Sequence, residues 1–364
     1  MKQKPKIFSI GGATFDIFIK AHDQAIVHLR TPDSRKEWFG LEYGGKVLID
    51  EIHETFGGGA SNTSIAFSRM GFDAYFVGMV GTEYGNRVLD NLKNEKVHLD
   101  FASRTNLDKT SFSTILNSFE GERTVLAYPG ANHYLKVEHL PLSALATADW
   151  IFLNHLSGLD NRIPMALVQL LEKHPRIKLA WNPGHEQIKQ GLKKWKPLLS
   201  HTEVLFLNKE EASLFSGIPV CPAGVKQDDP RLHGHIPTSF LPPYADDASH
   251  ILCAFSQAGV KNVVITDGKN GAQATDGKRV YFCPVVSHKI VDTLGAGDAF
   301  ASGFASARIL GEGLKDALRY GTINAQSVIS YFGAQKGLLR LKELLGKVAK
   351  SNLLVTSTAL KKQK

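Results

Sequence analysis

The spacing of apolar residues predicts alternating strands and helices along most of the chain. Short apolar runs typical of buried strands lie at residues 7–10, 74–80, 150–153, 177–181, 203–207 and 262–266. Helical spacing follows at 60–70, 84–95, 163–173, 209–215 and 248–258, with further helices to about residue 348. This alternation predicts an α/β fold, a three-layer α/β/α core with a mostly parallel sheet.

Three regions leave this rhythm. Residues 21–58 are charged and irregular, with short strand-like pieces such as 46–49, and residues 110–127 have the pattern of a hairpin. Strands from these two regions can pair into a small separate sheet. Residues 217–245 hold six of the fifteen prolines and mixed charge, which predicts an exposed insertion.

Composition narrows the class of protein. The chain has 364 residues, 43% hydrophobic and 21% charged, so it can bury a large core. Its three widely spaced cysteines suit neither a disulfide framework nor a metal site, so we expect a reducing, cytoplasmic location. The N-terminus leads into a strand, without the apolar region of a signal peptide, and no apolar stretch is long enough to span a membrane.

The net charge of +8 suits anionic ligands. It would also suit nucleic acid, but the lysines are scattered except at Lys361, Lys362 and Lys364. We therefore expect no nucleic-acid partner, and we expect this terminal segment to be a solvated basic tail.

The strongest chemical signal is the segment Val291–Phe300. Gly295, Ala296 and Gly297 let the backbone approach a ligand closely, and the helix that follows offers free N–H groups to an anion. Asp298 would repel a phosphate, but it is well placed to take a proton from a hydroxyl that attacks one. The competing interpretation is a glycine turn capped by an aspartate.

Three further segments have a catalytic interpretation and a structural one. The glycines at 57–59 open a helix that carries Asn62, which suits either a ligand loop or a helix cap. Asn208 and Glu211 have capping-box spacing, and the same geometry can hold magnesium through water. The turn at 266–268 follows a strand, as in many hairpins. No G-x-x-x-x-G-K-[ST] or G-x-G-x-x-G motif supports a P-loop or dinucleotide site.

Taken together, these motifs resemble the ribokinase-like carbohydrate kinase family, also called the phosphofructokinase-B family. The N-terminal glycine motif spans 57–71 and the C-terminal motif spans 292–300. Asp16, Asn208 with Glu211, the 266–268 turn and Asn324 are supporting matches in the same order. The resemblance covers about residues 6–345.

The resemblance implies a single kinase domain over residues 1–345, with a β-sheet lid from parts of 14–58 and 108–128, and a basic tail at 346–364. It implies an ATP-dependent carbohydrate kinase that uses Mg²⁺ and often a monovalent cation such as K⁺. It implies Asp298 as general base with Gly295, Ala296 and Gly297 as the anion hole. Substrate hydroxyls would be held by Asp16, Gly58 and Asn62. The nucleotide would lie along Asn208, Thr266, Gly268 and Asn324, with Glu211 and Asn208 on Mg²⁺ and Asp292 on the monovalent cation.

The chain departs from ribokinases proper at two positions. Gly59 stands where they usually have lysine, and Glu83 stands where G-x-D-x-x-G has aspartate. A fructokinase-like sugar kinase, a nucleoside kinase with Phe15 or Phe112 on the base, and a non-catalytic sugar-binding regulator stay open, although an intact Asp298 argues against the last. Lids of this kind can pair between chains, so a homodimer also stays open.

Overall fold

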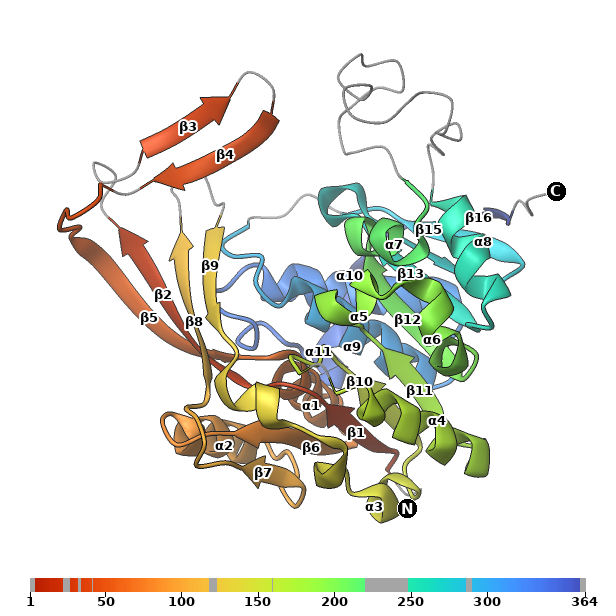
Figure 1. Ribbon diagram of the computed structural model, residues 1–364. Helices are drawn as coiled ribbons and strands as arrows, with labels where there is room; N and C mark the ends of the chain where they lie inside the picture. Colours follow the sequence, from red (N-terminus) through yellow and green to blue (C-terminus); the bar gives the residue numbers. More distant parts are fainter. Residues whose placement is uncertain are drawn as a thin grey trace.

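A large twisted sheet organises the main body of the molecule in the computed structural model (Figure 1). The structure describes residues 4–21, 27–31, 34–40, 42–117, 123–158, 160–219, 248–285 and 290–360. Within them the sheet has ten strands, in the order β16-β15-β14-β13-β12-β11-β10-β1-β6-β7. The strands are β1 (Lys6–Ile10), β6 (Asp73–Val80), β7 (Ala102–Arg104), β10 (Trp150–Leu153), β11 (Lys178–Trp181), β12 (Thr202–Asn208), β13 (Asn262–Thr266), β14 (Ala272–Thr275), β15 (Arg279–Cys283) and β16 (Thr356–Ala359).

The strands from β7 to β13 are parallel, and β14, β15 and β16 extend the sheet antiparallel. Parallel strands must be covered on both faces, and β12 shows how its sequence achieves this. Val204 and Phe206 pack into one core, whereas Leu205 and Leu207 pack into the other. The predicted three-layer α/β core with a mostly parallel sheet is confirmed.

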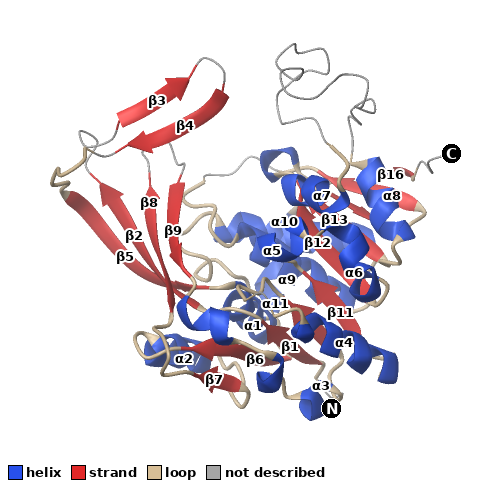
Figure 2. Ribbon diagram, viewed as in Figure 1, coloured by secondary structure: helices blue, strands red, loops and turns tan. Residues whose placement is uncertain are grey.

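Helices cover both faces of this sheet (Figure 2). One layer contains α1 (Gly59–Arg69), α9 (Ala296–Ile309), α10 (Leu314–Val328) and α11 (Leu341–Lys350). The other contains α4 (Arg162–Lys173), α6 (Gly191–Leu199), α7 (Lys209–Ser216) and α8 (Ser249–Gln257). The remaining α-helices among the described residues are α2 (Gly85–Asn94), α3 (Leu142–Leu145) and α5 (His185–Lys189).

A second, smaller sheet stands to one side of the main body (Figure 1). Its order is β5-β2-β8-β9, formed by β2 (Thr14–Ala21), β5 (Ile49–Gly57), β8 (Ser111–Asn117) and β9 (Arg123–Tyr128). A separate hairpin consists of β3 (Val27–Thr31) and β4 (Ser34–Gly40). The separate small sheet is thus confirmed, and we call it the lid sheet.

Several local expectations were wrong. The strand expected at 46–49 begins only at Ile49 and continues to Gly57. The apolar pattern did not predict β2, although the family resemblance placed the lid within residues 14–58. Strand β2 forms because its backbone pairs with β5 on one side and β8 on the other. These partners lie about 35 and 100 residues away, so local pattern does not show them.

The chain end also differs from the prediction. The domain was expected to stop at residue 345 and the rest to form a basic tail, but α11 continues to Lys350 and β16 pairs with β15. Leu353 and Leu360 are buried, which ties this segment to the core. The terminal residues 361–364 lie outside the described residues, as do residues 220–245 of the predicted insertion. None of the described helices combines the length and apolarity that crossing a membrane requires.

Candidate active site

The predicted site residues gather at the carboxyl ends of the parallel strands, where ligands bind in open α/β sheets. Strand β1 leads into Gly11 and Gly12, whose carbonyl accepts the first N–H groups of α1. Strands β12 and β13 end at Asn208 and Thr266 on the same edge. The lid sheet joins this edge through β2 and β5, which directly follow β1 and precede α1.

The turn before α9 is built for close approach. Gly295 adopts a left-handed conformation (φ 74°), and a Cβ there would lie 2.3 Å from the Cβ of Ala334. A Cβ at Gly297 would meet no described atom within 4 Å beyond the backbone of α9 itself, so the space beside this first turn is open. The backbone N–H groups of Gly297 and Asp298 bond to no other described atom. These first-turn donors are therefore available to an anion.

Asp298 lies in the first turn of α9, and its side chain is half-buried. Its carboxyl group accepts a hydrogen bond from one side chain. The amide Nδ2 of Asn62 donates to Asp298 Oδ2 at 2.8 Å. Burial raises the pKa of Asp298, and the hydrogen bond from Asn62 opposes that rise. Asp298 and Asn62 come from helices 236 residues apart in sequence, and the structure brings them together as predicted.

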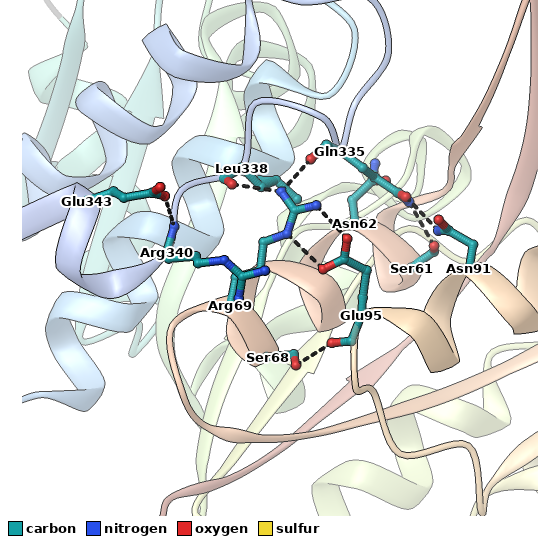
Figure 3. A network of polar contacts seen from close by, with 10 residues as sticks. All are labelled: Ser61, Asn62, Ser68, Arg69, Asn91, Glu95, Gln335, Leu338, Arg340 and Glu343. Carbon is teal, nitrogen blue, oxygen red and sulfur yellow. Dashed lines mark hydrogen bonds and ion pairs between the residues drawn. The ribbon is translucent and has the colours of Figure 1, made fainter.

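A chain of amide groups fixes the orientation of Asn62 (Figure 3). Gln335 Nε2 donates to Asn62 Oδ1 at 2.9 Å and to Ser61 Oγ at 3.0 Å, while Gln335 Oε1 accepts from Asn91 Nδ2 at 2.9 Å. Because the carbonyl of Asn62 faces Gln335, its NH₂ group must face Asp298. The orientation of Asn62 therefore depends on Gln335.

Arg69 anchors the segment that carries Gln335 (Figure 3). Its Nη1 donates to the backbone carbonyls of Gln335 (2.9 Å) and Leu338 (2.7 Å), and its other nitrogens form a two-point contact with Glu95 at 2.9 and 2.6 Å. Sequence analysis missed both Gln335 and Arg69. The available signal was slight: Arg69 lies seven residues after Asn62 and so on the same face of α1.

Asp16 is almost completely buried in β2. Burial raises its pKa to about 7, the nearby charge of Asp292 adds to the rise, and a hydrogen bond with Ser113 opposes it. A Cβ at Gly57 would lie 2.1 Å from Asp16 Oδ2, so only glycine leaves room for this carboxyl group. Asp16 thus lies at the joint between the lid sheet and α1.

Gly58 has a steric role at the same joint. It precedes α1 with φ 89°, and a Cβ there would lie 2.6 Å from the backbone of both Gly12 and Ala13. Any side chain would push α1, and Asn62 with it, away from β1.

Asp292 is buried in the turn before α9. Its two oxygens accept backbone N–H groups from Leu294 at 2.9 Å and Gly333 at 3.0 Å. These bonds tie the turn to the segment that also carries Ala334 and Gln335. Asp292 therefore links the predicted anion hole to the amide chain around Asn62.

Asn208 and Glu211 form a complete capping box at the start of α7. Asn208 Oδ1 accepts from the Glu211 N–H at 2.7 Å, and Glu211 Oε2 accepts from the Asn208 N–H at 2.9 Å. Burial raises the pKa of Glu211, and the charges of Glu210 and Asp298 raise it further. The helix-cap interpretation of this pair is therefore correct. Glu211 also lies close enough to Asp298 for the charge of Asp298 to affect its pKa.

Two histidines that sequence analysis did not single out lie at the same edge. His155 follows β10, and His185 begins α5. Burial lowers the pKa of His155, the nearby His185 lowers it further, and the charge of Glu186 opposes this. His185 also acts on Glu211, whose pKa it lowers. Isolated histidines carry no motif, so only their place at the strand ends reveals them.

The predicted nucleotide residues divide into two groups. Thr266 ends β13, and Gly268 is exposed in the turn that follows, beside the ion pair of Lys209 with Asp267 at 3.1 Å. Asn324 lies elsewhere: it is fully buried, its Nδ2 donates to the Ala299 carbonyl at 2.8 Å, and its Oδ1 accepts from the Leu339 N–H at 3.1 Å. The structure therefore places Asn324 inside the helix layer, with both ends of its amide group bonded to backbone.

The mostly parallel sheet is joined to a lid sheet. At the carboxyl ends of its strands, a helix offers free first-turn N–H donors beside a carboxylate. Together these features define a phosphotransferase that acts on a hydroxyl group. The chain belongs to the pfkB family of carbohydrate kinases, whose sequence model matches residues 24–340. These enzymes are ATP-dependent and transfer phosphate to sugar hydroxyls, and this protein is such a kinase.

Individual relatives are distant. A ribokinase from Staphylococcus aureus is 25% identical over 308 residues, which is 83% of this chain and 91% of the relative. The structure of Arabidopsis thaliana ribokinase complexed with ribose and ATP superposes with a TM-score of 0.72 at 19% identity, over 95% of this chain and 99% of that one. A nucleoside kinase from Methanocaldococcus jannaschii gives 0.70 at 18% identity, over 96% and 100%. Both structures share the fold.

Proposed function

We propose that this kinase phosphorylates a hydroxyl group of a small sugar or sugar derivative, with Asp298 as the general base. The observation that carries the proposal is the directed bond from Asn62 to Asp298 beside the free N–H groups of α9. Asp298 would take the hydroxyl proton while the N–H groups of Gly297 and Asp298 stabilise charge on the transferred phosphate.

We propose Asp16 and Asn62 as substrate-binding residues, with Gly58 holding the start of α1 in place. An ionised carboxylate accepts hydrogen bonds only, so Asp16 suits a pair of sugar hydroxyls. The nucleoside alternative needs an accessible aromatic face. Phe15 is fully buried, with its ring stacked on Tyr84 at 4.4 Å and Arg87 over it at 4.6 Å. This burial argues against Phe15 as the residue that stacks on a base, whereas the half-buried Phe112 of the lid sheet keeps the nucleoside alternative open.

The direct test is a panel of sugars and nucleosides offered with ATP, in which ADP release is measured. We expect one class of sugars to be phosphorylated, and Asp298→Asn to abolish the signal. Turnover of nucleosides alone would contradict the proposed substrate class, and turnover of no compound would favour the sugar-binding regulator.

For the nucleotide, we propose that Thr266 and Gly268 lie along the ATP phosphates and ribose. Mg²⁺ would arrive largely with the nucleotide, because it keeps several waters and usually uses one or two protein carboxylates. Asn208 and Glu211 fit this role. The capping box uses only one oxygen of Glu211. Burial raises the pKa of this carboxyl group, and neighbouring negative charges, which a cation would offset, raise it further.

Glu211→Gln should raise the Mg²⁺ concentration for half-maximal rate by at least about threefold, with little change in sugar affinity. The glutamine can still accept the Asn208 N–H, so the helix start should persist. Glu210→Gln is the matched control, because Glu210 is exposed in the same turn and makes no capping bond. An unchanged Mg²⁺ dependence in Glu211→Gln would leave the pair as a helix cap only.

We propose that Asp292 takes part in a monovalent-cation site, for which K⁺ is the natural candidate. The charge of Asp292 raises the pKa of Asp16, so the two carboxyl groups lie close together. A nearby cation would favour the ionised form of Asp16. Dependence of the rate on K⁺ against Na⁺ measures this directly.

A second copy of the chain is proposed to cover the lid sheet. Its strands β5 and β9 expose apolar side chains, which are Ile49, Ile52, Val125, Leu126 and Tyr128. Exposed apolar side chains on both edge strands of the lid sheet suit a homodimer. Sedimentation of the wild type and of a Leu126→Glu variant measures the oligomeric state. A cytoplasmic location stays a prediction.

We also propose Gln335 as a positioning residue for the base. Gln335→Met removes the donor that orients Asn62. Gln335→Glu replaces this donor with an acceptor, so the NH₂ group of Asn62 turns to Glu and its carbonyl turns toward Asp298. Loss of the Asn62 donor raises the pKa of Asp298. We expect the acid limb of kcat/KM to move to higher pH by roughly 0.5–1 unit in Gln335→Met, and further in Gln335→Glu.

Asn91→Ala is the control for this pair, because it removes a partner of Gln335 without touching the donor to Asn62. Its pH profile should stay near wild type. Equal rate losses in all three variants at every pH would assign Gln335 a purely structural role.

A further inference from the structure

A basic cavity lies at the amino ends of the parallel strands, whereas the candidate active site lies at their carboxyl ends. Its volume is about 540 Å³, and its polar and aromatic lining includes Lys4, Lys6, Asp149, Trp150, Arg176 and Lys178. Lys6, Trp150 and Lys178 are the first residues of the neighbouring parallel strands β1, β10 and β11, near the N-terminus in Figure 1.

The two sites lie at opposite ends of α9. Asp298 is in the first turn of this helix, and Ile309 is its last residue and lines the basic cavity. At 1.5 Å per residue, a 14-residue helix is about 21 Å long. A ligand in the basic cavity is therefore distinct from one at the catalytic edge.

The charges of the basic cavity are unbalanced. Four cations line it, namely Lys4, Lys6, Arg176 and Lys178, against the single carboxylate of Asp149. None of the four forms an ion pair with another described residue. Cations elsewhere do find partners, as in the pairs Lys209–Asp267 at 3.1 Å and Lys261–Glu203 at 2.9 Å. Four clustered cations repel one another, and a bound anion would offset this cost.

The one carboxylate already serves the backbone. Asp149 Oδ2 accepts the Lys6 N–H at 2.8 Å, the Asp149 N–H donates to the Lys6 carbonyl at 3.0 Å, and its carbonyl accepts the Lys178 N–H at 3.1 Å. These bonds join the starts of the three strands. The lysines are therefore mounted on a rigid edge, and a concave wall of one sign concentrates its field on a ligand.

The remaining groups suit a phosphate ester. Arg176 uses Nη2 on the Ala146 carbonyl at 3.1 Å, and its other donors make no bond with a described atom. Lys178 Nζ lies 5.4 Å from the centre of the Trp150 ring, and both residues line the cavity. Guanidinium and ammonium groups are the usual partners of phosphate. The volume is also in the range of small-molecule sites.

We propose that the basic cavity binds a small molecule that carries two or more phosphate groups. The test uses inorganic tripolyphosphate without Mg²⁺, with binding measured by calorimetry and located by amide hydrogen exchange. We expect saturable binding with protection of residues 4–6, 147–150 and 176–178. The double variant Arg176→Glu, Lys178→Glu should bind at least about tenfold more weakly.

The matched control reverses two exposed lysines on α6, Lys193→Glu with Lys194→Glu, which gives the same change in net charge away from the basic cavity. It should keep wild-type affinity. A neutral double variant, Arg176→Gln with Lys178→Gln, should show an intermediate loss even where charge reversal impairs folding. Protection confined to residues 293–300, or equal losses in the α6 control, would overturn the proposal. Because the readout is binding, its result is independent of the kinase activity.

Discussion

Asp298→Asn should lower kcat by at least about a hundredfold while the protein stays folded and binds ATP. Asparagine keeps the size of the side chain, and its carbonyl can still accept the Asn62 Nδ2 that now lies 2.8 Å from Asp298. It cannot accept the hydroxyl proton. The free N–H groups of the α9 turn are untouched, so the loss should appear in the chemical step alone.

The measurement is single-turnover phosphoryl transfer, with ATP affinity and thermal unfolding as controls. The pH dependence adds a second check. Because burial raises the pKa of Asp298, the base is ionised only above a limit higher than that of an ordinary aspartate. The wild-type rate should therefore fall on the acid side, and the residual rate of the variant should lack that limb. Near-normal turnover would remove Asp298 from the mechanism.

Asp16→Asn should weaken sugar binding and, above neutral pH, stabilise the folded protein. The pKa of Asp16 is about 7 in the folded state, well above the ordinary pKa of an aspartate. Well below pH 4 the group is protonated in both states, so no stability is lost. Between about pH 4 and 7 the unfolded chain ionises while the folded protein keeps the proton, so the free energy of unfolding falls across this window by roughly 4 kcal/mol and stays lower at higher pH. The asparagine variant avoids this loss.

The expected result is a free energy of unfolding that falls from pH 5 to pH 8 in the wild type more than in the variant. KM for the sugar should rise about ten- to a hundredfold in the variant, since a charge-assisted bond is worth roughly 1.5–3 kcal/mol. KM for ATP is the control and should hardly change. A variant that gains stability but keeps its sugar KM would place Asp16 outside the substrate site.

The local parts of this site could be predicted from sequence. A helix start depends on a few consecutive residues, so the glycine turn with Asp298 and the capping box of Asn208 with Glu211 were predicted and occur as such. The alternating strands and helices were equally accessible, because each is encoded by its own apolar spacing. Gly57 and Gly58 belong to the same class, since a turn that tolerates only glycine shows in the residue type.

Other features depend on which distant segments meet. Asp16 acquires its raised pKa only because β2 is enclosed by β5 and β8. Asn324 looked like a ligand residue in the sequence, yet its helix turns it to backbone groups of α9 and of Leu339. Gln335 orients Asn62 from 273 residues away. Side-chain direction, burial and charge are collective properties of packed elements, so the tertiary structure alone decided them. The chain's own turns and periodicities determined the fold and the position of the glycine turn that carries Asp298.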